Sequence, residues 1–362
     1  MKILQVMAGA PEGGAETAFI DFCIAQKQSG EDVIVATRPN RIRVPALERE
    51  NIPVYQYPFG GKVDVYTPFA LRRLIAREKP QIVQAWMARA AAKIPEWHGD
   101  ERDKPYRVVS RLGNYYKIKN FKQTDYFTTI TPMIREYLIE NGVHPDAVRH
   151  INNFAETEAD TTPLSRSEFD TPEDAPVLLT LSRLHDAKGL DILIKALADL
   201  PGVYLWLAGD GPLRIELVSL AKKTGVADRV KFLGWRTDRA ALLEAADVLV
   251  FPSRFEPFGT TFVQAWAHKV PLVTSDADGP RQFVKDGEDG LIVPRDDVEQ
   301  LRHAIDRVIS NPDLKKSLVE KGYRRYEGEF TKDKCLHEYM DFYQDILRRN
   351  EIEIPIRQSA PA

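Results

Sequence analysis

Residues 177–208 read VLLTLSRLHDAKGLDILIKALADLPGVYLWLA. The apolar runs at the two ends of this stretch, Val177–Leu181 and Tyr204–Ala208, are short and uninterrupted, as in buried strands of a parallel sheet. Between them, Leu190 to Leu200 shows the apolar spacing of a helix. The stretch therefore predicts a strand–helix–strand unit, the building block of a doubly wound α/β domain.

Outward from this unit, the same alternation of short apolar runs and helical segments continues in both directions. Before it, we predict strands at Ile3–Met7, Val33–Thr37, Val54–Tyr57, Ile82–Ala85, Val108–Ser110, Phe127–Thr129 and Val148–Ile151. After it, we predict strands at Val230–Leu233, Val248–Phe251, Leu272–Thr274 and Leu291–Val293. This pattern indicates an α/β protein with two doubly wound parallel sheets.

A polar stretch divides the two series of strands. Residues 152–176 lose the apolar periodicity and are rich in Thr, Pro, Asp, Glu and Ser, which is typical of a linker. We predict a Rossmann-like N-terminal domain over residues 1–155 and a second such domain over residues 177–330. At the end of the chain, we predict a helix over residues 331–350 that packs back towards the N-terminal domain, and a flexible tail over residues 351–362.

The composition excludes several classes of protein. Of 362 residues, 43% are hydrophobic and 28% are charged, which excludes a disordered, collagen-like or coiled-coil chain. Cys23 and Cys335 lie far apart, and the seven histidines lack metal-ligand spacing, so neither a disulfide framework nor a metal site is expected. We find no signal peptide and no run of about 18 apolar residues, and therefore expect a cytoplasmic protein.

The charge is unevenly distributed along the chain. Residues 1–150 contain 22 Lys+Arg against 17 Asp+Glu, a net charge of +5, whereas the remainder has a net charge of −8. The basic half and the tandem Arg72–Arg73 suggest an anionic acceptor or peripheral contact with the inner face of a membrane. Lys117, Lys119 and Lys122, which follow Tyr115–Tyr116, lead to the same hypothesis. The alternative is an ordinary solvated surface, and no nucleic-acid partner is expected.

In a doubly wound sheet, ligands bind beyond the carboxyl ends of the strands, so the turns that follow the strands are of most interest. The turn at residues 9–16 contains Gly13 and Gly14, which allow backbone N–H groups to approach an anion at a helix start. The turn at residues 182–189 contains Arg183 and Lys188, two cations suited to a diphosphate. The alternatives are an ordinary turn for the first and a surface ion pair for the second.

Two further turns follow later strands. Gly209–Pro212 is rich in glycine and is consistent with a simple tight turn. The loop that begins at Pro252 presents Glu256, is shaped by Pro257 and Gly259, and leads into a helix that begins near Thr260. The N-terminal N–H groups of that helix would point back towards the same edge of the sheet.

Five stretches of this region resemble the donor-binding domain of family 4 glycosyltransferases, which are retaining enzymes of the two-domain GT-B fold with a cleft between the domains. In chain order they are LSRLHDAKGLDILIKAL, LWLAGDGPLR, VKFLGWR, AADVLVFPSRFEPFGTTFVQAW and PLVTSDADGPRQFVKDGEDGLIVP. The N-terminal half is similar more loosely, through Gly13-Gly14-Ala15-Glu16 and the rhythm of strands and helices.

The resemblance implies a role for individual residues. Arg183 and Lys188 match the cations that bind the donor diphosphate, and Glu256 matches the first acid of an E-x7-E motif that contacts sugar hydroxyls. The implied catalytic residues are Glu256, Arg183 and Lys188, with no metal. The implied donor-binding residues also include Gly13, Gly14, Gly234, Trp235, Phe258, Gly259, Thr260 and Gln264.

Two positions depart from the family pattern. Gln264 replaces the second acid of E-x7-E, so ribose binding is expected to be weaker or differently arranged. Many relatives have a histidine after the strand at Val108–Ser110, where this chain reads Arg111-Leu112-Gly113-Asn114. The expected acceptor-side residues are Glu16, Arg111 and Asn114.

The resemblance thus implies a metal-independent, retaining glycosyltransferase without a cofactor. It would move a hexose-type sugar from a UDP- or GDP-linked donor to a glycan or lipid-linked acceptor, in the biosynthesis of cell-surface polysaccharide or lipopolysaccharide. The donor would bind mainly to the C-terminal domain and the acceptor mainly to the N-terminal domain. The alternatives are a GT-B-fold protein that binds a nucleotide sugar without transferring it, and a sugar-nucleotide epimerase.

Overall fold

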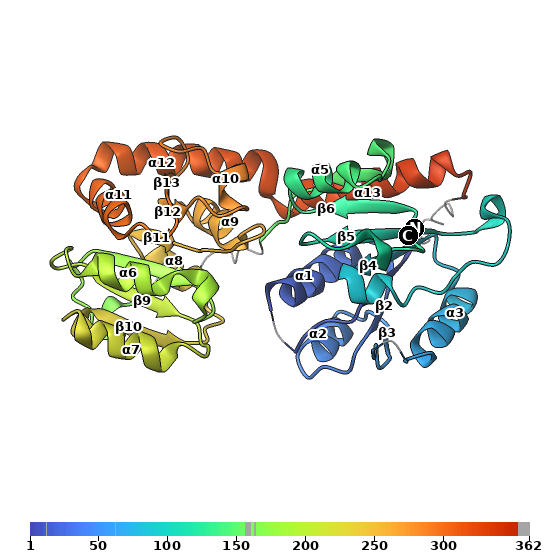
Figure 1. Ribbon diagram of the computed structural model, residues 1–362, viewed down its shortest axis with the longest axis horizontal. Coiled ribbons are helices and arrows are strands. Elements are labelled where there is room, and N and C mark those ends of the chain that lie inside the picture. Colours follow the sequence, from blue (N-terminus) through green and yellow to red (C-terminus); the bar gives the residue numbers. More distant parts are fainter. Residues whose placement is uncertain (12, 62, 156–160, 163, 354–362) are drawn as a thin grey trace, which may run out of the picture. The chain divides into compact units, whose positions relative to one another are not determined.

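Two parallel β-sheets organise the chain, a 7-stranded sheet and a 6-stranded sheet. The computed structural model describes residues 1–362 except 12, 62, 156–160, 163 and 354–362. Part of the predicted linker and most of the predicted tail therefore lie outside the described residues. The chain divides into two compact units, with Met1–Asn153 and the segment from Lys332 onward in unit 1, and Phe154–Thr331 in unit 2 (Figure 1).

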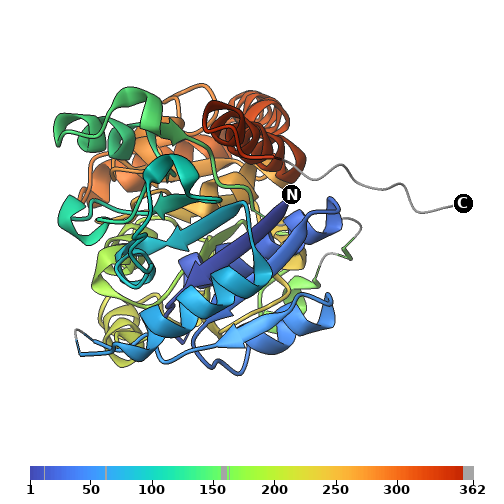
Figure 2. The ribbon, with the colours of Figure 1, turned by 90° about the vertical axis from the view of Figure 1, so that its right-hand side faces the viewer.

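The sheet of unit 1 has the strand order β3-β2-β1-β4-β5-β6-β7. Its strands are β1 (Lys2–Met7), β2 (Asp32–Thr37), β3 (Val54–Gln56), β4 (Ile82–Trp86), β5 (Arg107–Leu112), β6 (Tyr126–Thr129) and β7 (Val148–His150). The helices of this unit are α1 (Gly14–Gln28), α2 (Arg43–Arg49), α3 (Tyr66–Glu78), α4 (Met87–Ala91), α5 (Pro132–Glu140) and α13 (Lys332–Arg349), with 3₁₀ turns at Glu101–Asp103, Ile118–Asn120 and Pro145–Ala147. Figure 2 views this unit from its side.

The sheet of unit 2 has the strand order β10-β9-β8-β11-β12-β13. Its strands are β8 (Val177–Leu181), β9 (Tyr204–Ala208), β10 (Val230–Gly234), β11 (Val248–Phe251), β12 (Leu272–Ser275) and β13 (Leu291–Val293). The helices are α6 (Leu190–Leu197), α7 (Arg214–Lys223), α8 (Arg239–Ala245), α9 (Thr260–Ala267), α10 (Pro280–Phe283), α11 (Val298–Ser310) and α12 (Pro312–Arg325). Short 3₁₀ turns lie at Arg166–Phe169, Asp186–Lys188 and Ala227–Arg229, and a π-helical turn at Tyr326–Phe330.

The predicted α/β class with two doubly wound sheets is confirmed. Each predicted strand is present, because buried Val, Ile and Leu runs with helical crossovers leave few other ways to pair. The largest boundary error lies at β5: the strand predicted at Val108–Ser110 extends from Arg107 to Leu112, whereas the other strand ends differ from the prediction by at most one residue. Arg111 therefore lies inside β5, where it pairs in register with Trp86 and Thr128, and not in the following loop.

Helix α13 packs on unit 1, as Figures 1 and 2 show. Its amphipathic face buries Tyr339, Phe342, Tyr343 and Ile346. The Tyr343 hydroxyl donates a hydrogen bond to the side chain of Gln84. Asp345 on the same helix forms a 3.0 Å ion pair with Arg149 of β7. A long amphipathic helix needs such a partner because it cannot bury its apolar face alone.

Residues 161–176, which were expected to belong to a linker, include anchored positions in unit 2. Trp206 Nε1 donates to Thr171 Oγ1 at 3.1 Å. Arg166 Nη2 donates to Asp247 Oδ2 at 2.9 Å, and Asp247 Oδ2 also accepts the backbone N–H of Val177 at 3.0 Å. Arg166 and Thr171 are thus anchored in unit 2 by side chains that lie far along the chain.

Candidate functional site

The carboxyl edge of the unit 2 sheet contains a topological switch point. All neighbouring strands in this sheet are parallel, so their carboxyl ends meet at one edge. The chain passes from β8 to β9 on one side, whereas β11 borders β8 on the other side. Crevices at such points are the usual ligand sites of open α/β sheets. The turns after β8, β9, β10 and β11 all emerge there, and they contain the residues predicted from sequence.

Lys188 and Glu256 form an ion pair at this edge, although 68 residues separate them. Lys188 Nζ donates to Glu256 Oε2, and the two side chains are 22% and 15% exposed. The Lys188 ammonium also lies 5.7 Å from the centre of the Phe251 ring. The structure thus brings the predicted cation and the predicted acid together, in a partly buried place that ligand groups can still reach.

Glycine at position 189 allows the two loops to approach each other. Gly189 has φ +63°, and a Cβ there would lie 2.1 Å from the carbonyl oxygen of Pro252. Any other residue would push apart the loop that carries Lys188 and the loop that carries Glu256. The backbone N–H groups of Arg254 and Phe255 donate to the Ala187 carbonyl at 2.9 and 3.1 Å, which fixes the approach from the other side.

Sequence reasoning missed Arg254, which ties these loops together. Its guanidinium donates to Asp296 Oδ1 at 2.6 Å, to Asp191 Oδ2 at 3.0 Å and to the Asp186 carbonyl at 2.9 Å. The hydrogen bond with Asp191, followed by that with Asp296, raises the pKa of Arg254. Its place two residues before Glu256 was visible, but its three partners come from segments that only the fold assembles.

The loop after Glu256 is shaped by its own backbone and by an aromatic cluster. Gly259 has φ +98° and a Cβ there would lie 2.8 Å from the Phe251 ring, so glycine is required. The Glu256 carbonyl accepts the Gly279 N–H at 2.7 Å. The Phe258 side chain is 3% exposed and packs against Phe262 and Phe283, with ring centres 5.2 and 5.1 Å away. The Phe258 ring therefore serves the packing of the loop and is not available to a ligand.

Helix α9 begins at Thr260, directly after this loop, and has eight residues. The Phe262 N–H donates to the Gly259 carbonyl at 2.9 Å, and the first turn carries the positive end of the helix dipole. Gln264 lies one turn further on and is 8% exposed. Its side chain makes no hydrogen bond with the described residues, so the amide that replaces the usual acid has unused donors and acceptors.

Arg183 projects from the turn after β8. It is exposed, and it forms no ion pair within the part of the chain that the structure describes. The turn after β9 supports its backbone: a Cβ on Gly209 would lie 1.9 Å from the Ser182 carbonyl oxygen, and the Leu184 N–H donates to the Asp210 carbonyl at 3.0 Å. Gly209 thus allows the turn after β9 to pack closely against the turn after β8, which holds the exposed Arg183 at the edge of the sheet.

Gly234 and Trp235 lie at the end of the next strand. Gly234 has φ +70° and forms a bridge with Gly209, which places the turn after β10 beside the turn after β9. The Trp235 side chain is 54% exposed. A large exposed ring can stack on a planar ligand group.

The carboxyl edge of the unit 1 sheet also has a switch point, between β1 and β4. The Gly13–Gly14 turn follows β1 there, and the Glu16 carboxylate accepts the Ala10 N–H at 2.6 Å. A Cβ on Gly13 would lie 2.5 Å from Glu16 Oε2. Glu16 is 8% exposed, so it stabilises the turn at the start of α1 and has little surface for an acceptor.

Arg111 and Asn114, the other expected acceptor-side residues, are also engaged within unit 1. Arg111 is 4% exposed, lies 4.0 Å from the Trp86 ring centre and contacts the side chains of Tyr339 and Asn153. Asn114 Oδ1 accepts the N–H of Tyr115 at 2.7 Å. The structure therefore does not place these side chains together as a free polar surface.

Sequence reasoning also missed Arg43 beneath the Gly13–Gly14 turn. Arg43 is 1% exposed, donates from Nε to Thr37 Oγ1 at 2.9 Å and approaches the Ala10 carbonyl with Nη1 at 3.4 Å. Burial lowers its pKa. Gly9, with φ +58°, makes room for the guanidinium, because a Cβ there would lie 2.6 Å from Nη1. The buried Arg43 guanidinium therefore packs against Gly9 and Ala10, at the beginning of the turn that follows β1.

No cluster of three or more His, Cys, Asp or Glu side chains is arranged to hold a metal ion among the described residues. None of the described helices is both long and apolar enough to cross a bilayer.

The two halves of the chain match two family models. Residues 12–159 match the model described as Glycosyltransferase Family 4, and residues 162–325 match the model described as Glycosyl transferases group 1. The boundary between the two matches falls beside the boundary between the two units.

Known proteins resemble the chain along nearly its whole length. It is 34% identical to the lipopolysaccharide core biosynthesis glycosyltransferase LpsE of Rhizobium meliloti, over 94% of this chain and 98% of that protein. It is 30% identical to LpsD of the same organism, over 95% of this chain and 98% of that protein. The crystal structure of Anabaena Alr3699/HepE in complex with UDP and glucose superposes with a TM-score of 0.81, at 22% identity, over 95% of this chain and 100% of that one. The chain therefore belongs to the family 4 glycosyltransferases of the GT-B fold.

Proposed function

We propose that this glycosyltransferase moves a hexose-type sugar from a UDP- or GDP-linked donor to a growing lipopolysaccharide core, with retention of anomeric configuration and without a metal ion. The relatives LpsE and LpsD are named for lipopolysaccharide core biosynthesis, which supports the acceptor class. The similar Anabaena structure contains UDP and glucose, which supports the donor class. The acceptor is then a glycan, linked to lipid and met at the inner face of a membrane.

The observation on which the donor site rests is the Lys188–Glu256 pair beside the first turn of α9. The Lys188 ammonium and the Glu256 carboxylate satisfy each other. A bound donor would exchange this contact for two better ones, since Lys188 would bind diphosphate oxygens and Glu256 would accept hydrogen bonds from sugar hydroxyls. Arg183, which has no ion pair within the described residues, would complete the diphosphate site.

The remaining donor contacts follow from the same edge of the sheet. The backbone N–H groups of Phe258, Gly259 and Thr260 would face the sugar and the phosphate. Gln264 would hydrogen bond the ribose through its unused amide, and Gly234 with Trp235 would border the base. Gly13 and Gly14, the other donor-binding residues predicted from the sequence, would offer backbone N–H groups to an anion at the start of α1.

The proposed reaction keeps the acceptor and the leaving group on one face of the sugar. The acceptor hydroxyl attacks the anomeric carbon as its bond to the diphosphate breaks, and a departing phosphate oxygen takes the hydroxyl proton. Arg183, Lys188 and the N-terminus of α9 stabilise the negative charge that develops on the leaving group. These groups supply the charge that a metal ion supplies elsewhere, so activity should survive treatment with EDTA.

The test is a panel of UDP-, GDP- and ADP-linked sugars, with free nucleoside diphosphate as the readout. Slow hydrolysis that disappears in Lys188→Ala and Glu256→Ala supports transfer chemistry. If the protein binds a nucleotide sugar tightly but no core acceptor leads to turnover, the result would favour the alternative function, a protein that binds a nucleotide sugar without transferring it. Gln264 and the absence of a histidine after β5 are the features that motivate this alternative. Interconversion of the sugar without release of nucleotide would indicate the epimerase. The anomeric coupling constant of the product decides between retention and inversion.

A further inference from the structure

Large apolar side chains are exposed together at one place in unit 1, at the start of α3. Val63 and Val65 are 92% and 80% exposed, and Tyr66 and Phe69 are each 58% exposed. We call these four side chains the apolar knuckle. Scattered apolar residues on a surface are ordinary, but a cluster of this kind marks a contact with another molecule or with a membrane.

The apolar knuckle is built on a fixed support. Asp64, inside the cluster, accepts hydrogen bonds from the Gly60 N–H at 2.7 Å, the Thr67 N–H at 3.0 Å and the Thr67 hydroxyl at 2.6 Å. The buried ammonium of Lys93 lies 3.6 Å from Asp64 Oδ2 and donates to the Gly61 carbonyl at 2.9 Å. The hydrogen bonds of Asp64 and Lys93 therefore fix the backbone of this segment, while its apolar side chains stay exposed.

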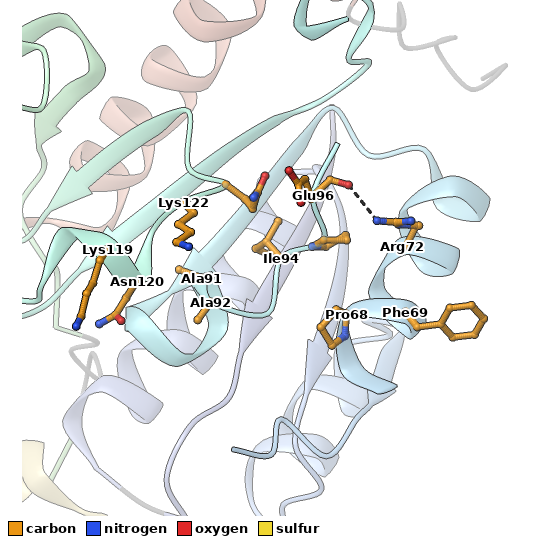
Figure 3. A pocket seen from close by; sticks show the side chains of 12 residues that line it. Pro68, Phe69, Arg72, Ala91, Ala92, Ile94, Glu96, Lys119, Asn120 and Lys122 are labelled. Carbon is orange, nitrogen blue, oxygen red and sulfur yellow. Dashed lines mark hydrogen bonds between the residues drawn. The ribbon is translucent and has the colours of Figure 1, made fainter. Parts of the chain in front are cut away.

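A basic groove of about 720 Å³ adjoins the apolar knuckle. Figure 3 shows Phe69 of α3 at one end of the groove, with Lys119 and Lys122 on another wall. Arg72 lines it too, and donates from Nη2 to the Glu96 carbonyl at 3.1 Å. Three of the lining residues are cationic and one, Glu96, is acidic. Lys119 and Lys122 are exposed and form no ion pair with the described residues, so their charges are available to a ligand.

We propose that the apolar knuckle and the basic groove together are the surface by which this protein binds an anionic lipid bilayer. The apolar side chains would enter the interface between headgroups and acyl chains, where tyrosine and phenylalanine are favoured. Arg72, Lys119 and Lys122 would bind headgroup phosphates. The combination of protruding apolar groups with unpaired cations favours a bilayer, because a protein partner would have to supply both an apolar socket and fixed acidic groups.

This inference rests on the proposed function, because an enzyme with a lipid-linked acceptor must reach that acceptor at a membrane. Its physical content can be measured without turnover. A basic side chain close to an anionic leaflet contributes about a fivefold gain in partitioning, so the loss of two lysines should weaken vesicle binding roughly 30-fold. Replacing two side chains of the apolar knuckle by serine should weaken it about tenfold.

The experiment is sedimentation of the full chain with vesicles of phosphatidylcholine alone or mixed with phosphatidylglycerol. The test variants are Lys119→Gln/Lys122→Gln in the groove and Val65→Ser/Phe69→Ser in the apolar knuckle. The matched controls lie in unit 2: Lys222→Gln/Lys223→Gln removes the same charge from the exposed side of α7, and Ile215→Ser removes an apolar side chain that is 82% exposed. We expect binding to the mixed vesicles, losses in both test variants, and wild-type binding in both controls.

Three results would overturn the proposal. Equal losses in the two lysine pairs would show a general charge effect. Equal binding to both kinds of vesicle would show that the cations do not respond to the net negative charge of the bilayer. A dimer in solution that Val65→Ser/Phe69→Ser dissociates, with vesicle binding unchanged, would assign the apolar knuckle to a second copy of the chain. Donor hydrolysis in solution should be the same in the test variants and the wild type. If hydrolysis is absent in every protein while vesicle binding follows the expected order, the proposed function fails and this inference stands.

Discussion

The carboxyl edges of the two sheets share a topology but use their charged residues differently. In unit 2, the edge presents an exposed Arg183 and a partly exposed Lys188–Glu256 pair. In unit 1, Glu16 and Arg43 near the equivalent edge are buried and serve its own turns: the Glu16 carboxylate accepts the Ala10 N–H, and the Arg43 guanidinium lies against Gly9. A switch point therefore provides a place for a ligand, but the exposure and pairing of its side chains decide which edge is equipped to bind an anion.

The largest effect should come from the charged pair of unit 2. Lys188→Ala and Glu256→Ala should each lower the turnover of the nucleotide sugar about 100- to 1,000-fold, because the first removes a cation proposed to stabilise the leaving group and the second removes the proposed acceptor of hydrogen bonds from the sugar. The measurement is release of nucleoside diphosphate at saturating donor, with circular dichroism to show that the fold is retained. Lys222→Ala, on the exposed side of α7, is the control. Near-normal turnover in Lys188→Ala would contradict the claim that the carboxyl edge of the unit 2 sheet, unlike that of unit 1, is equipped to bind the donor.

The next effect should come from the close approach of the two loops in unit 2. Gly189→Ala should lower the free energy of unfolding by about 3 kcal/mol and reduce donor turnover, because its Cβ would lie 2.1 Å from the Pro252 carbonyl oxygen. Gly225→Ala is the matched control: its φ is similar, +72°, but nothing lies within 4 Å of the added atom. There we expect a loss of only about 1 kcal/mol and normal turnover. Equal losses in urea unfolding would show that the loop contact is unimportant.

A stability effect of similar or smaller size should come from the buried arginine of unit 1. Arg43→Met keeps most of the apolar volume but leaves the buried Thr37 hydroxyl without its donor, so we expect a loss of about 2 kcal/mol in the free energy of unfolding. Arg41→Met, at an exposed position two residues earlier, should change it by less than about 0.5 kcal/mol. If Arg43→Met leaves the free energy of unfolding unchanged, the buried guanidinium does not stabilise unit 1 and this prediction is wrong.

The smallest effect concerns the acid dependence of the turn below the apolar knuckle. Burial raises the pKa of Asp64, but the hydrogen bonds from Thr67 and Gly60 outweigh it and lower the pKa to about 2 from 3.8. Because the pKa is lower in the folded state, the stabilisation is complete above about pH 4 and is lost as the pH falls through about 2. Asp64→Asn should flatten the stability profile of unit 1 in that window, measured by urea unfolding. A stability profile of Asp64→Asn that matches the wild type between about pH 4 and about pH 2 would contradict this prediction.

The strands show how much of the fold could be predicted. Runs such as Val248–Phe251 are recognisable because a strand buried on both faces must be continuously apolar. The end of β5 was misplaced because Arg111 looks like a loop residue until the Trp86 ring and the Tyr339 hydroxyl are placed beside it. The anchoring of Arg166 on Asp247 was invisible for the same reason, since its partner lies 81 residues away.

The sequence by itself determined the α/β class, the positions of the strands and the turns in which a donor site should lie, because these depend on local periodicity and on short motifs. Only the tertiary structure decided that Lys188 meets Glu256, that Arg254 joins three segments around them, and that Glu16 and Arg111 are committed to packing within unit 1. It also placed Lys119 and Lys122 in one groove with Phe69. The physical reason is that pairing and burial depend on distances between side chains, which residues far apart in the chain acquire only when the sheets assemble.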